Sequence, residues 1–315
     1  MRLNDALSIQ SPIICGPMYP CSNPELIAAV SNAGGIGIVQ PITLTYVHGY
    51  EFREGLRYIK SLTDRPIGFN ALIEKSSRVY EKKMMHWIQI ALEEGVRFFI
   101  TSLGNPTAVV KLVHAYGGLV YHDATEAKWA KIAVKAEVDG LIAVNSQAGG
   151  HAGIYDQKEL FRRLKPFGLP LICAGGIGDK EAYEKAMSLG YSGVQMGTRF
   201  IATTECDVSL AYKGAIVSST QDDIVLSQNL TGVDVSIIRP KRDKEYKTTS
   251  NFLVRWALKQ PILKRIIRVW MAVRSIAYLK KTRHSETPDV IWQAGKSVEG
   301  VHQIKSVAEV FESLR

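Results

Sequence analysis

Cysteine is scarce in this chain, and its spacing argues against several kinds of site. Four cysteines occur among 315 residues, and no two of them form a CxxC pair. Structural zinc sites and iron–sulfur clusters usually draw on such pairs, so the sequence predicts neither. Asp222 and Asp223 are adjacent but have no ligand set around them, and no metal is expected. Few, unpaired thiols fit a reducing compartment, so we expect a cytoplasmic protein.

Long apolar runs are missing as well. The chain opens with Met1–Asp5 rather than with a charged and then apolar leader, and no uninterrupted apolar stretch is long enough to cross a bilayer. We therefore expect neither a secretory signal nor a transmembrane segment. The composition, 46% hydrophobic and 22% charged, is typical of a soluble globular protein.

Positive charge is concentrated in one late segment. The formal net charge is +9, yet the stretch from Arg239 to Arg283 holds 14 Lys and Arg against 2 Asp and Glu. The rest of the chain keeps 25 basic and 28 acidic residues and is mildly acidic. A local excess of cations indicates an anionic partner or a membrane surface and says little about fold. No nucleic-acid partner is predicted.

Short apolar runs alternate with amphipathic stretches over the first 220 residues. Continuous apolar runs predict strands buried on both faces, and their alternation with helices predicts a parallel sheet. Eight strands predict an α/β fold, a (β/α)8 TIM barrel. The competing doubly wound sheet would show a GxGxxG turn after an early strand, and none follows Pro12–Met18. The expected strands are Pro12–Met18, Ile36–Pro41, Ile67–Ile73, Phe98–Gly104, Leu119–Asp123, Leu141–Asn145, Leu169–Gly175 and Gly193–Phe200, with helices over Asn23–Asn32, Tyr80–Glu94, Ala124–Glu137 and Asp179–Ser188.

The residues after the expected barrel strands have two possible interpretations. We expect residues 1–220 and 290–315 to form the barrel, and residues 221–289 to form a smaller, mainly helical insert. One interpretation is a lid that packs on the barrel with its cations in solvent. The other is a basic amphipathic helix that contacts an anionic membrane or an acidic carrier protein. The expected helices are Phe252–Lys259 and Ile262–Lys280, separated by Pro261, and the second carries Lys264, Arg265 and Arg268 on one stripe.

Small and polar residues gather where the expected strands end. Residues Ala148–Ile154 read AGGHAGI and carry one titratable group, His151, between glycines. Histidine titrates near neutrality, so His151 is a candidate for proton transfer at the catalytic end of a barrel. The alternative is a flexible turn with an incidental histidine. The same rim holds further polar groups and glycines, which favours an enzyme with a bound cofactor: Gly16-Pro17-Met18, Asn70, Ser102 with Gly104, His122 with Asp123, Gly175-Gly176 and Gly197-Thr198.

Two glycine clusters end the seventh and eighth expected strands. Ala174–Gly178 reads AGGIG and precedes a helix that opens at Asp179, while Met196–Arg199 reads MGTR. The loops after these two barrel strands often bind phosphate at a helix N-terminus. No GKS/T sequence follows either cluster, so the chain is not a nucleotide-hydrolysing P-loop protein. The pair fits a mononucleotide cofactor such as FMN, and two tight turns without a ligand are the alternative.

These motifs resemble those of the nitronate monooxygenase family, formerly called 2-nitropropane dioxygenases, and of its sister, the FMN-dependent enoyl-ACP reductase II. The resemblance covers nearly the whole chain except about residues 241–289. The matching segments are Pro12–Met18, Asn32–Gly37, Gly68–Asn70, Ala148–His151, Cys173–Ile177, Met196–Phe200, Asn229–Val233 and Trp292–Lys296.

The resemblance implies an FMN-binding barrel in which the histidine of AGGH, here His151, is the catalytic base. It would take the α-proton of a nitroalkane or hold an anionic nitronate, and FMN with O2 would yield a carbonyl compound and nitrite. The protein would orient and tune the flavin, which carries the redox chemistry. The flavin contacts that the resemblance implies are Met18, Asn70, Gly150, Ala174, Gly175, Gly176, Met196, Gly197, Thr198, Ala294 and Gly295.

Three residues depart from the pattern of the relatives. Gln147 precedes AGGH where many relatives have Glu, and Asp123 stands where they often have Lys. An inward Asp123 would weaken stabilisation of an anionic reduced flavin. Lys296 replaces a common Gln and is a candidate for the missing positive charge.

Two further functions stay open. One is an NAD(P)H-dependent flavin reductase acting on an enoyl thioester or a quinone, since the reductase relatives share AGGH. The other is a flavin-binding, membrane-associated protein without activity, which the departures at Gln147 and Asp123 leave open. Nicotinamide binding cannot be read from the sequence, because these barrels lack the GxGxxG fingerprint.

Overall fold

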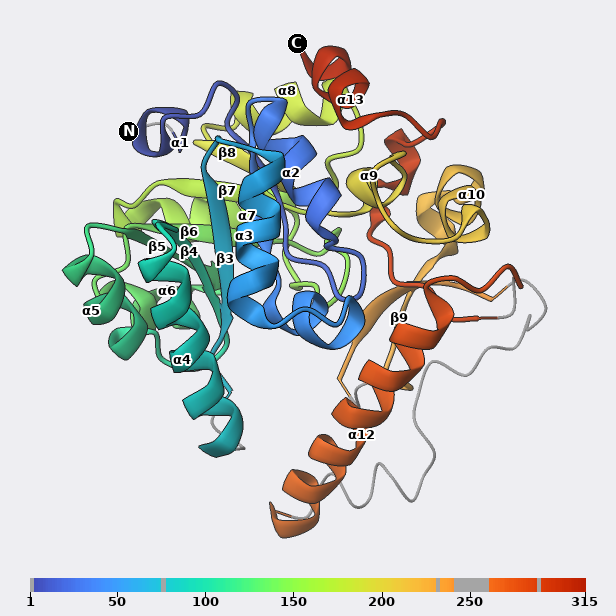
Figure 1. Ribbon diagram of the computed structural model, residues 1–315. Helices are drawn as coiled ribbons and strands as arrows, with labels where there is room; N and C mark the ends of the chain where they lie inside the picture. The colour runs from blue at the N-terminus through green and yellow to red at the C-terminus, as the bar shows by residue number, and fades with distance from the viewer. Residues whose placement is uncertain (1–2, 75–77, 231–232, 241–260, 288–289) are drawn as a thin grey trace.

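Eight parallel strands close into a barrel in chain order, with the last strand returning to the first (Figure 1). The computed structural model describes residues 3–74, 78–230, 233–240, 261–287 and 290–315. The strands are β1 (Ile13–Cys15), β2 (Ile36–Val39), β3 (Ile67–Leu72), β4 (Phe98–Ser102), β5 (Leu119–Ala124), β6 (Gly140–Val144), β7 (Leu171–Ala174) and β8 (Gly193–Met196). At the closure, Ile14 of β1 pairs with Ile36 of β2 on one side and with Gln195 of β8 on the other.

Helices form a layer around the outside of the barrel (Figure 1). Side-chain caps define where several of them begin: Asp179 accepts a hydrogen bond from the Ala182 amide at the start of α8. The helices are α1 (Leu3–Leu7), α2 (Pro24–Asn32), α3 (Phe52–Leu62), α4 (Arg78–Glu93), α5 (Thr107–Ala115), α6 (Ala127–Lys135), α7 (Gln157–Leu164), α8 (Lys180–Ser188), α9 (Thr198–Ile201), α10 (Leu210–Ser218) and α13 (Val307–Leu314), with a π-helical turn η1 (Thr43–Val47) and 3-10 turns η2 (Lys165–Phe167), η3 (Gln221–Asp223) and η4 (Lys296–Gly300).

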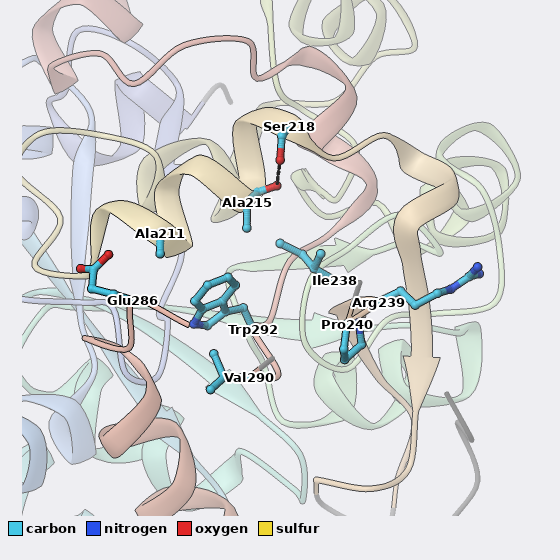
Figure 2. Close-up of a pocket in the computed structure, with 9 residues that line it drawn as sticks. All are labelled: Ala211, Ala215, Ser218, Ile238, Arg239, Pro240, Glu286, Val290 and Trp292. Carbon is cyan, nitrogen blue, oxygen red and sulfur yellow. Dashed lines mark hydrogen bonds between the residues drawn. The ribbon is translucent and has the colours of Figure 1, made fainter. Parts of the chain in front are cut away.

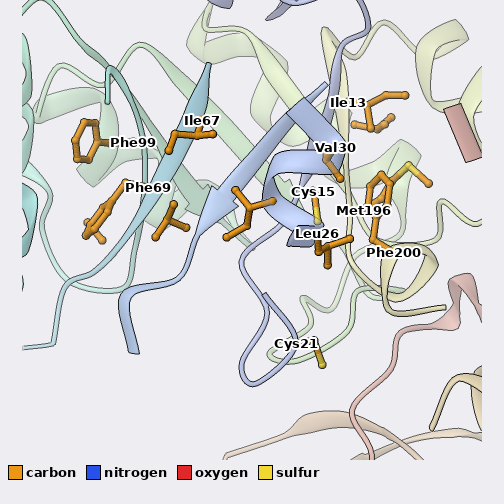
Figure 3. Packing of buried hydrophobic residues seen from close by; sticks show 14 of the residues in the cluster. Ile13, Cys15, Cys21, Leu26, Val30, Ile67, Phe69, Phe99, Met196 and Phe200 are labelled. Atoms are coloured by element: carbon orange, nitrogen blue, oxygen red, sulfur yellow. The ribbon is translucent and has the colours of Figure 1, made fainter. Parts of the chain in front are cut away.

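Successive residues of each strand face opposite sides of the barrel wall. On β5, Tyr121 belongs to the cluster that fills the barrel, whereas Val120 and Ala124 belong to the cluster between strands and helices. Figure 3 shows part of this outer cluster, in which Cys15 of β1 and Met196 of β8 lie close to residues of α2. Because the direction alternates, the face on which any strand residue lies can be assigned from its neighbours.

The chain after the barrel builds a small layer at the carboxyl end of the strands. It contains an antiparallel pair, β9 (Ile224–Ser227) and β10 (Val235–Ile238), and the long helix α12 (Pro261–Thr282). Leu279 of α12 packs with residues of β10. The Tyr19 hydroxyl, in the loop after β1, donates to the Ile276 carbonyl at 2.7 Å. The last turns of α12 are thereby fixed to the barrel, while its first turns extend away from it (Figure 1).

The predicted (β/α)8 barrel is confirmed, and the strand ends differ. The expected strand Pro12–Met18 is shortened to β1, because the chain leaves the sheet at Gly16. The expected strand Gly193–Phe200 stops at Met196, and α9 begins two residues later. The predicted site residues Met18, Gly175 and Gly197 therefore lie in loops at the carboxyl end of the barrel, whereas Asn70, Ala174 and Met196 remain in strands.

The segment 221–289, which was expected to be mainly helical, contributes the long helix α12 and also the β9–β10 sheet. The expected helix Ile262–Lys280 is present within α12. The expected helix Phe252–Lys259 lies outside the described residues, as do the side chains of Lys264, Arg265 and Arg268. The division into residues 1–220 with 290–315 and residues 221–289 stays a prediction. Of the helices that are described, none is long and apolar enough to span a bilayer.

Candidate functional site

The loop that carries His151 is anchored on both sides. Asn145, fully buried at the end of β6, accepts hydrogen bonds from the amides of Gln147 (through Oδ1, 2.8 Å) and Gly153 (through its carbonyl, 3.1 Å). On the other side, the Ser236 amide of β10 donates to the Gly150 carbonyl at 2.8 Å. His151 therefore follows directly on a backbone segment held between the barrel and the β9–β10 sheet.

The His151 ring is accessible to solvent yet surrounded by enough protein to change its titration. None of the described residues forms a hydrogen bond with the ring. Loss of solvation lowers its pKa below the ordinary value of 6.5. The imidazole is therefore neutral at pH 7 and has a nitrogen lone pair free to accept a proton.

The glycines after β7 are required by close packing and by backbone conformation. Gly175 has φ +116°, and a Cβ there would stand 2.6 Å from the Ala148 amide nitrogen. Gly176 has φ +82°, and a Cβ there would collide with the side-chain oxygen of Gln147. The AGGH loop and the AGGIG loop thus lie directly against each other. Gln147, one of the three departures, points toward the second of these glycines.

The predicted phosphate cradle has free donors. Among the described residues, the structure shows no acceptor for the backbone amides of Gly176, Gly197 and Thr198. The Thr198 hydroxyl oxygen accepts from the Gly295 amide at 2.9 Å, which leaves the hydroxyl proton available to donate. Three amides and one hydroxyl from neighbouring loops are the donor set that a phosphate ester requires.

The segment 294–296 is tied to the His151 loop through the backbone. The Lys296 amide donates to the Gln147 carbonyl at 3.0 Å, and a Cβ on Gly295 would stand 2.5 Å from the Gly149 amide nitrogen. Ala294 is buried beside them. The Lys296 side chain is exposed at the start of η4. The late motif predicted from the sequence therefore lies at the same end of the barrel as AGGH.

Three polar side chains point into the barrel without a partner. The outward neighbours of Asn70, Asp123 and Gln195 lie in the outer cluster or on the outer face, which places these three on the inner face of β3, β5 and β8. Asn70 Oδ1, Asp123 Oδ1 and Gln195 Oε1 are each buried and form no hydrogen bond. Buried polar atoms are nearly always paired, so three orphans at one end of a barrel indicate the site of a polar ligand.

Gln195 was missed by the sequence analysis. It occupies the centre of an apolar strand, GVQM, and lies against Gly16, where a Cβ would stand 3.0 Å from its Cγ. The signal was a lone polar residue in a strand that is otherwise buried, at the rim where glycines were already noted.

The side chains of three other predicted flavin contacts, Met18, Ala174 and Met196, lie in different surroundings. Met18 is half-buried, and its sulfur lies where it would touch a Cβ on Gly197, at 3.4 Å. Ala174 faces the barrel interior. The Met196 side chain points outward into the helix layer (Figure 3), so only its backbone can reach the pocket. Its carbonyl accepts from the Gly16 amide at 2.9 Å.

His122 lies away from the pocket that it was considered for. Its ring is buried on the outer face of β5, and Nδ1 lies 2.8 Å from the Thr101 hydroxyl of β4. Burial lowers its pKa to about 4, so it is a neutral packing residue. The next residue, Asp123, faces the interior, and burial raises its pKa to about 7.

A separate cavity of about 150 Å³ lies between α10 and the end of β10 (Figure 2). Trp292 forms one wall, stacks on Tyr212 with ring centroids 5.2 Å apart, and donates through Nε1 to the Thr282 carbonyl at the end of α12. The lining includes none of the predicted site residues. The cavity belongs to the base of the added layer.

Comparison with known proteins agrees with these features. A profile of the nitronate monooxygenase family matches residues 1–315. A nitronate monooxygenase of Pseudomonas aeruginosa is 29% identical over 274 residues, which cover 73% of this chain and 77% of that protein. A (3aS,4S,5R,7aS)-5-hydroxy-7a-methyl-1-oxo-octahydro-1H-indene-4-carboxyl-CoA dehydrogenase of Rhodococcus jostii is 29% identical over 232 residues, which cover 73% of this chain but only 63% of that protein.

Solved structures share the fold. FabK from Thermotoga maritima matches with a TM-score of 0.80 and 25% identity over 99% of this chain and 94% of that chain. A nitroalkane oxidase from Streptomyces ansochromogenes matches with a TM-score of 0.74 over 99% of this chain and 96% of that chain; at 19% identity this likeness concerns the fold alone. Since the family profile spans all 315 residues, the chain belongs to the nitronate monooxygenase family, as its motifs predict, and it is an oxidoreductase.

Proposed function

We propose that the carboxyl end of the barrel binds FMN and that the protein is a nitronate monooxygenase. Its reaction would be the oxidation of alkyl nitronates or nitroalkanes by O2 to a carbonyl compound and nitrite. The observation that carries the proposal is the set of three buried, unpartnered polar side chains, Asn70, Asp123 and Gln195, at the end of the barrel that also holds His151. Membership of the family supports the same reaction.

The residues present suit this cofactor. A flavin ring carries an N–H donor between carbonyl acceptors on one edge, and the amide groups of Asn70 and Gln195 can pair with either kind of atom because each amide both donates and accepts. The phosphate would take the free amides of Gly176, Gly197 and Thr198. The remaining predicted contacts, among them Met18, Gly150, Ala174, Gly175, Met196, Ala294 and Gly295, belong to the loops and strand ends at this end of the barrel or to the segment 294–296 tied to them.

His151 is the proposed base. Because loss of solvation lowers its pKa, its neutral ring can accept the α-proton of a nitroalkane at pH 7. The imidazolium that forms lies beside the nitronate anion and holds it in place by charge. FMN, when bound, supplies the electron-accepting group that the side chains of this chain lack. Gly150, with φ +67° and no atom within 4 Å of a Cβ position, leaves open space next to the base.

Anaerobic reduction tests the reaction class. The purified protein should carry a yellow flavin that propionate-3-nitronate reduces within the mixing time, and FMN should be released on denaturation. Bleaching by NADH without any response to nitronate would contradict the proposal. A colourless protein that binds no added FMN would show that FMN is not its cofactor.

A second candidate is a reductase or dehydrogenase acting on an acyl thioester. The Rhodococcus relative is named as a dehydrogenase of a carboxyl-CoA compound, and FabK shares the fold at a TM-score of 0.80. The same spectral experiment separates the two functions, with NADH and an enoyl-CoA added in turn. Reduction by NADH followed by reoxidation with the enoyl thioester alone is the result that this second function requires.

The His151→Asn variant tests the proposed base. It should retain FMN and oxidise preformed nitronate, but its kcat/KM for neutral nitroethane should fall at least about a hundredfold, since general base catalysis contributes that much. His302→Asn, at an exposed position, is the matched control and should behave like the wild type. Equal nitroethane turnover in His151→Asn and wild type would refute the assignment.

Contact with an anionic membrane or an acidic carrier through residues 241–283 stays a prediction. Liposomes containing phosphatidylserine, sedimented at low and high salt, provide the measurement. Sedimentation of the protein only at low salt supports the membrane contact, and none at low salt excludes the membrane contact. The expected cytoplasmic location is checked by fractionation of cells that express the protein.

A further inference from the structure

Asp123 is the one carboxyl group among the three unpartnered side chains inside the barrel mouth. It is the second-last residue of β5 and points inward, since Val120 and Ala124 lie in the outer cluster and Tyr121 in the inner one. Its Oδ1 atom is buried and unpaired, although the residue as a whole keeps partial exposure. Because the side chain points inward, that exposure is toward the open end of the barrel.

The strands on either side of Asp123 offer it no charge. The inner faces of β4 and β6 consist of apolar residues and Ser102, and the neighbouring His122 points to the opposite face. No described cation forms an ion pair with the carboxyl group. Loss of solvation is the cause that shifts its pKa, which rises to about 7. With its pKa this close to neutrality, the carboxyl group keeps its proton in a large share of the molecules at pH 7, and in that form it is a hydrogen-bond donor rather than an anion.

Asn70 and Gln195 present amides from the inner faces of β3 and β8, and their buried oxygens are acceptors without donors. A ligand seated on this polar floor would therefore meet two amides and one carboxyl group. An ionised carboxyl group would face the acceptor atoms of a flavin ring unfavourably, whereas a protonated one can donate to them.

We infer that Asp123 is a positioning residue that binds the flavin ring as a neutral carboxylic acid, donating a hydrogen bond from the floor of the barrel mouth. The inference rests on the proposed FMN site and adds a chemical property to it. A lysine at this position would supply positive charge to the ring, but Asp123 supplies a proton without charge. Flavin affinity should then depend on the protonation of this one side chain.

Flavin binding as a function of pH measures this dependence directly. FMN is titrated into apoprotein between pH 6.5 and pH 8.5, and flavin fluorescence gives the Kd. The pKa of His151 lies below its ordinary value of 6.5, so its ring is mostly neutral in this window, and a phosphate ester is largely dianionic. If only the protonated form binds well, the wild-type Kd should rise about tenfold or more across the window. Asp123→Asn, which keeps a donor but cannot ionise, should bind FMN with a Kd that is nearly constant.

Two comparisons make the result decisive. Asp64→Asn removes a carboxyl group at an exposed position before β3 and should keep the wild-type pH dependence. A wild-type Kd that is constant, or that decreases with pH, overturns the role of Asp123 while leaving FMN binding itself intact. The same pH dependence in Asp123→Asn and wild type also overturns it. Absence of FMN binding in the wild type at every pH overturns the inference together with the proposed function.

Discussion

Gly176 shows how closely single positions at the barrel mouth are determined by their neighbours. Its φ of +82° lies in the region that favours glycine, and the Gln147 side chain occupies the direction that a Cβ would take. Gln157 lies behind it and donates through Nε2 to the Gly175 carbonyl at 3.0 Å. The conformation of Gly176 therefore influences how the His151 loop and the AGGIG loop meet.

Gly176→Ala should lower the free energy of unfolding by about 1–2 kcal/mol from backbone strain alone and weaken FMN binding as well. Urea unfolding of the apoprotein and FMN titration are the measurements. Gly214→Ala is the matched control, since Gly214 lies inside α10 with open space around its Cβ position. The control should be neutral or slightly stabilising, because alanine favours helix. Equal stability of the two variants would contradict the close packing at Gly176.

The sequence located the glycines and polar residues of the barrel mouth better than it assigned the directions of their side chains. His151 and the glycine pairs could be located because no regular element explains them. Gln195 was not found, because whether a strand residue faces inward depends on the position of its neighbours in a closed barrel. Met196 was expected as a contact, but strand alternation turns its side chain into the helix layer.

At the scale of whole elements, helix α12 is held on the barrel at its C-terminal end by a few specific contacts among the described residues. Its last turns rest on the loops after β1 and β2: Tyr19 donates to the Ile276 carbonyl, and Lys280 Nζ donates to the Tyr46 carbonyl at 2.5 Å. Arg283, just after the helix, forms an ion pair with Asp207 at 3.4 Å. The contact with the loop after β1 bears on the proposed FMN site, because the same loop holds Met18, a predicted flavin contact.

Tyr19→Phe should loosen this end of α12. Loss of one hydrogen bond of about 1 kcal/mol should speed amide hydrogen exchange about fivefold over residues 274–283. Tyr58→Phe removes a hydroxyl that bonds Glu25 on the barrel surface and should leave exchange in α12 unchanged. Unaltered exchange in Tyr19→Phe would show that the remaining contacts suffice to hold the helix.

Strands and helices with a regular pattern of apolar residues were predicted best. The eight strands, and the helices α2, α4, α6 and α8, follow from apolar runs and amphipathic stretches. The β9–β10 sheet was not predicted, because its two strands have four residues each and pair across a loop of several residues. Its pairing is fixed by tertiary contacts, including the Ser236 hydrogen bond to Gly150, which no local pattern encodes.

At the scale of the whole molecule, the C-terminal residues pack against the outer surface of the barrel. Helix α13 packs against α2 and α8, and Phe311 fills the space left by Gly35 on the way into β2. Arg199 of α9, itself buried, donates to the carbonyl of Gln303 at 2.8 Å. Helix α13 and the segment before it therefore pack against the outside of the barrel.

Phe311→Ala should destabilise the whole protein by about 3–5 kcal/mol, because it removes a fully buried ring. Urea unfolding followed by circular dichroism should show a single transition at lower urea. Leu210→Ala, at a side chain that is 71% exposed, should change the midpoint little. Two separate transitions in Phe311→Ala would indicate that α13 unfolds independently of the barrel.

His122 and Asp123, side by side on β5, have a consequence for the proton balance of folding. His122 has a folded pKa of about 4 against 6.5, so over that interval the unfolded chain binds one proton more. Asp123 has a folded pKa of about 7 against 3.8, so over its interval the folded chain binds one proton more. Between pH 4 and pH 6.5 the two differences cancel, and the pair adds no pH dependence to stability.

Substituting either residue alone should make the free energy of unfolding depend on pH between pH 4 and pH 6.5. In His122→Gln only Asp123 remains, so relative to the wild type the free energy of unfolding should fall by about 3 kcal/mol as pH rises from 4 to 6.5. In Asp123→Asn only His122 remains, and the change should have the opposite sign. Urea unfolding of the apoprotein at several pH values measures both, and wild-type profiles in both variants would contradict it. Folding, on this account, transfers a proton from one residue to the next along the chain and leaves the net charge unchanged.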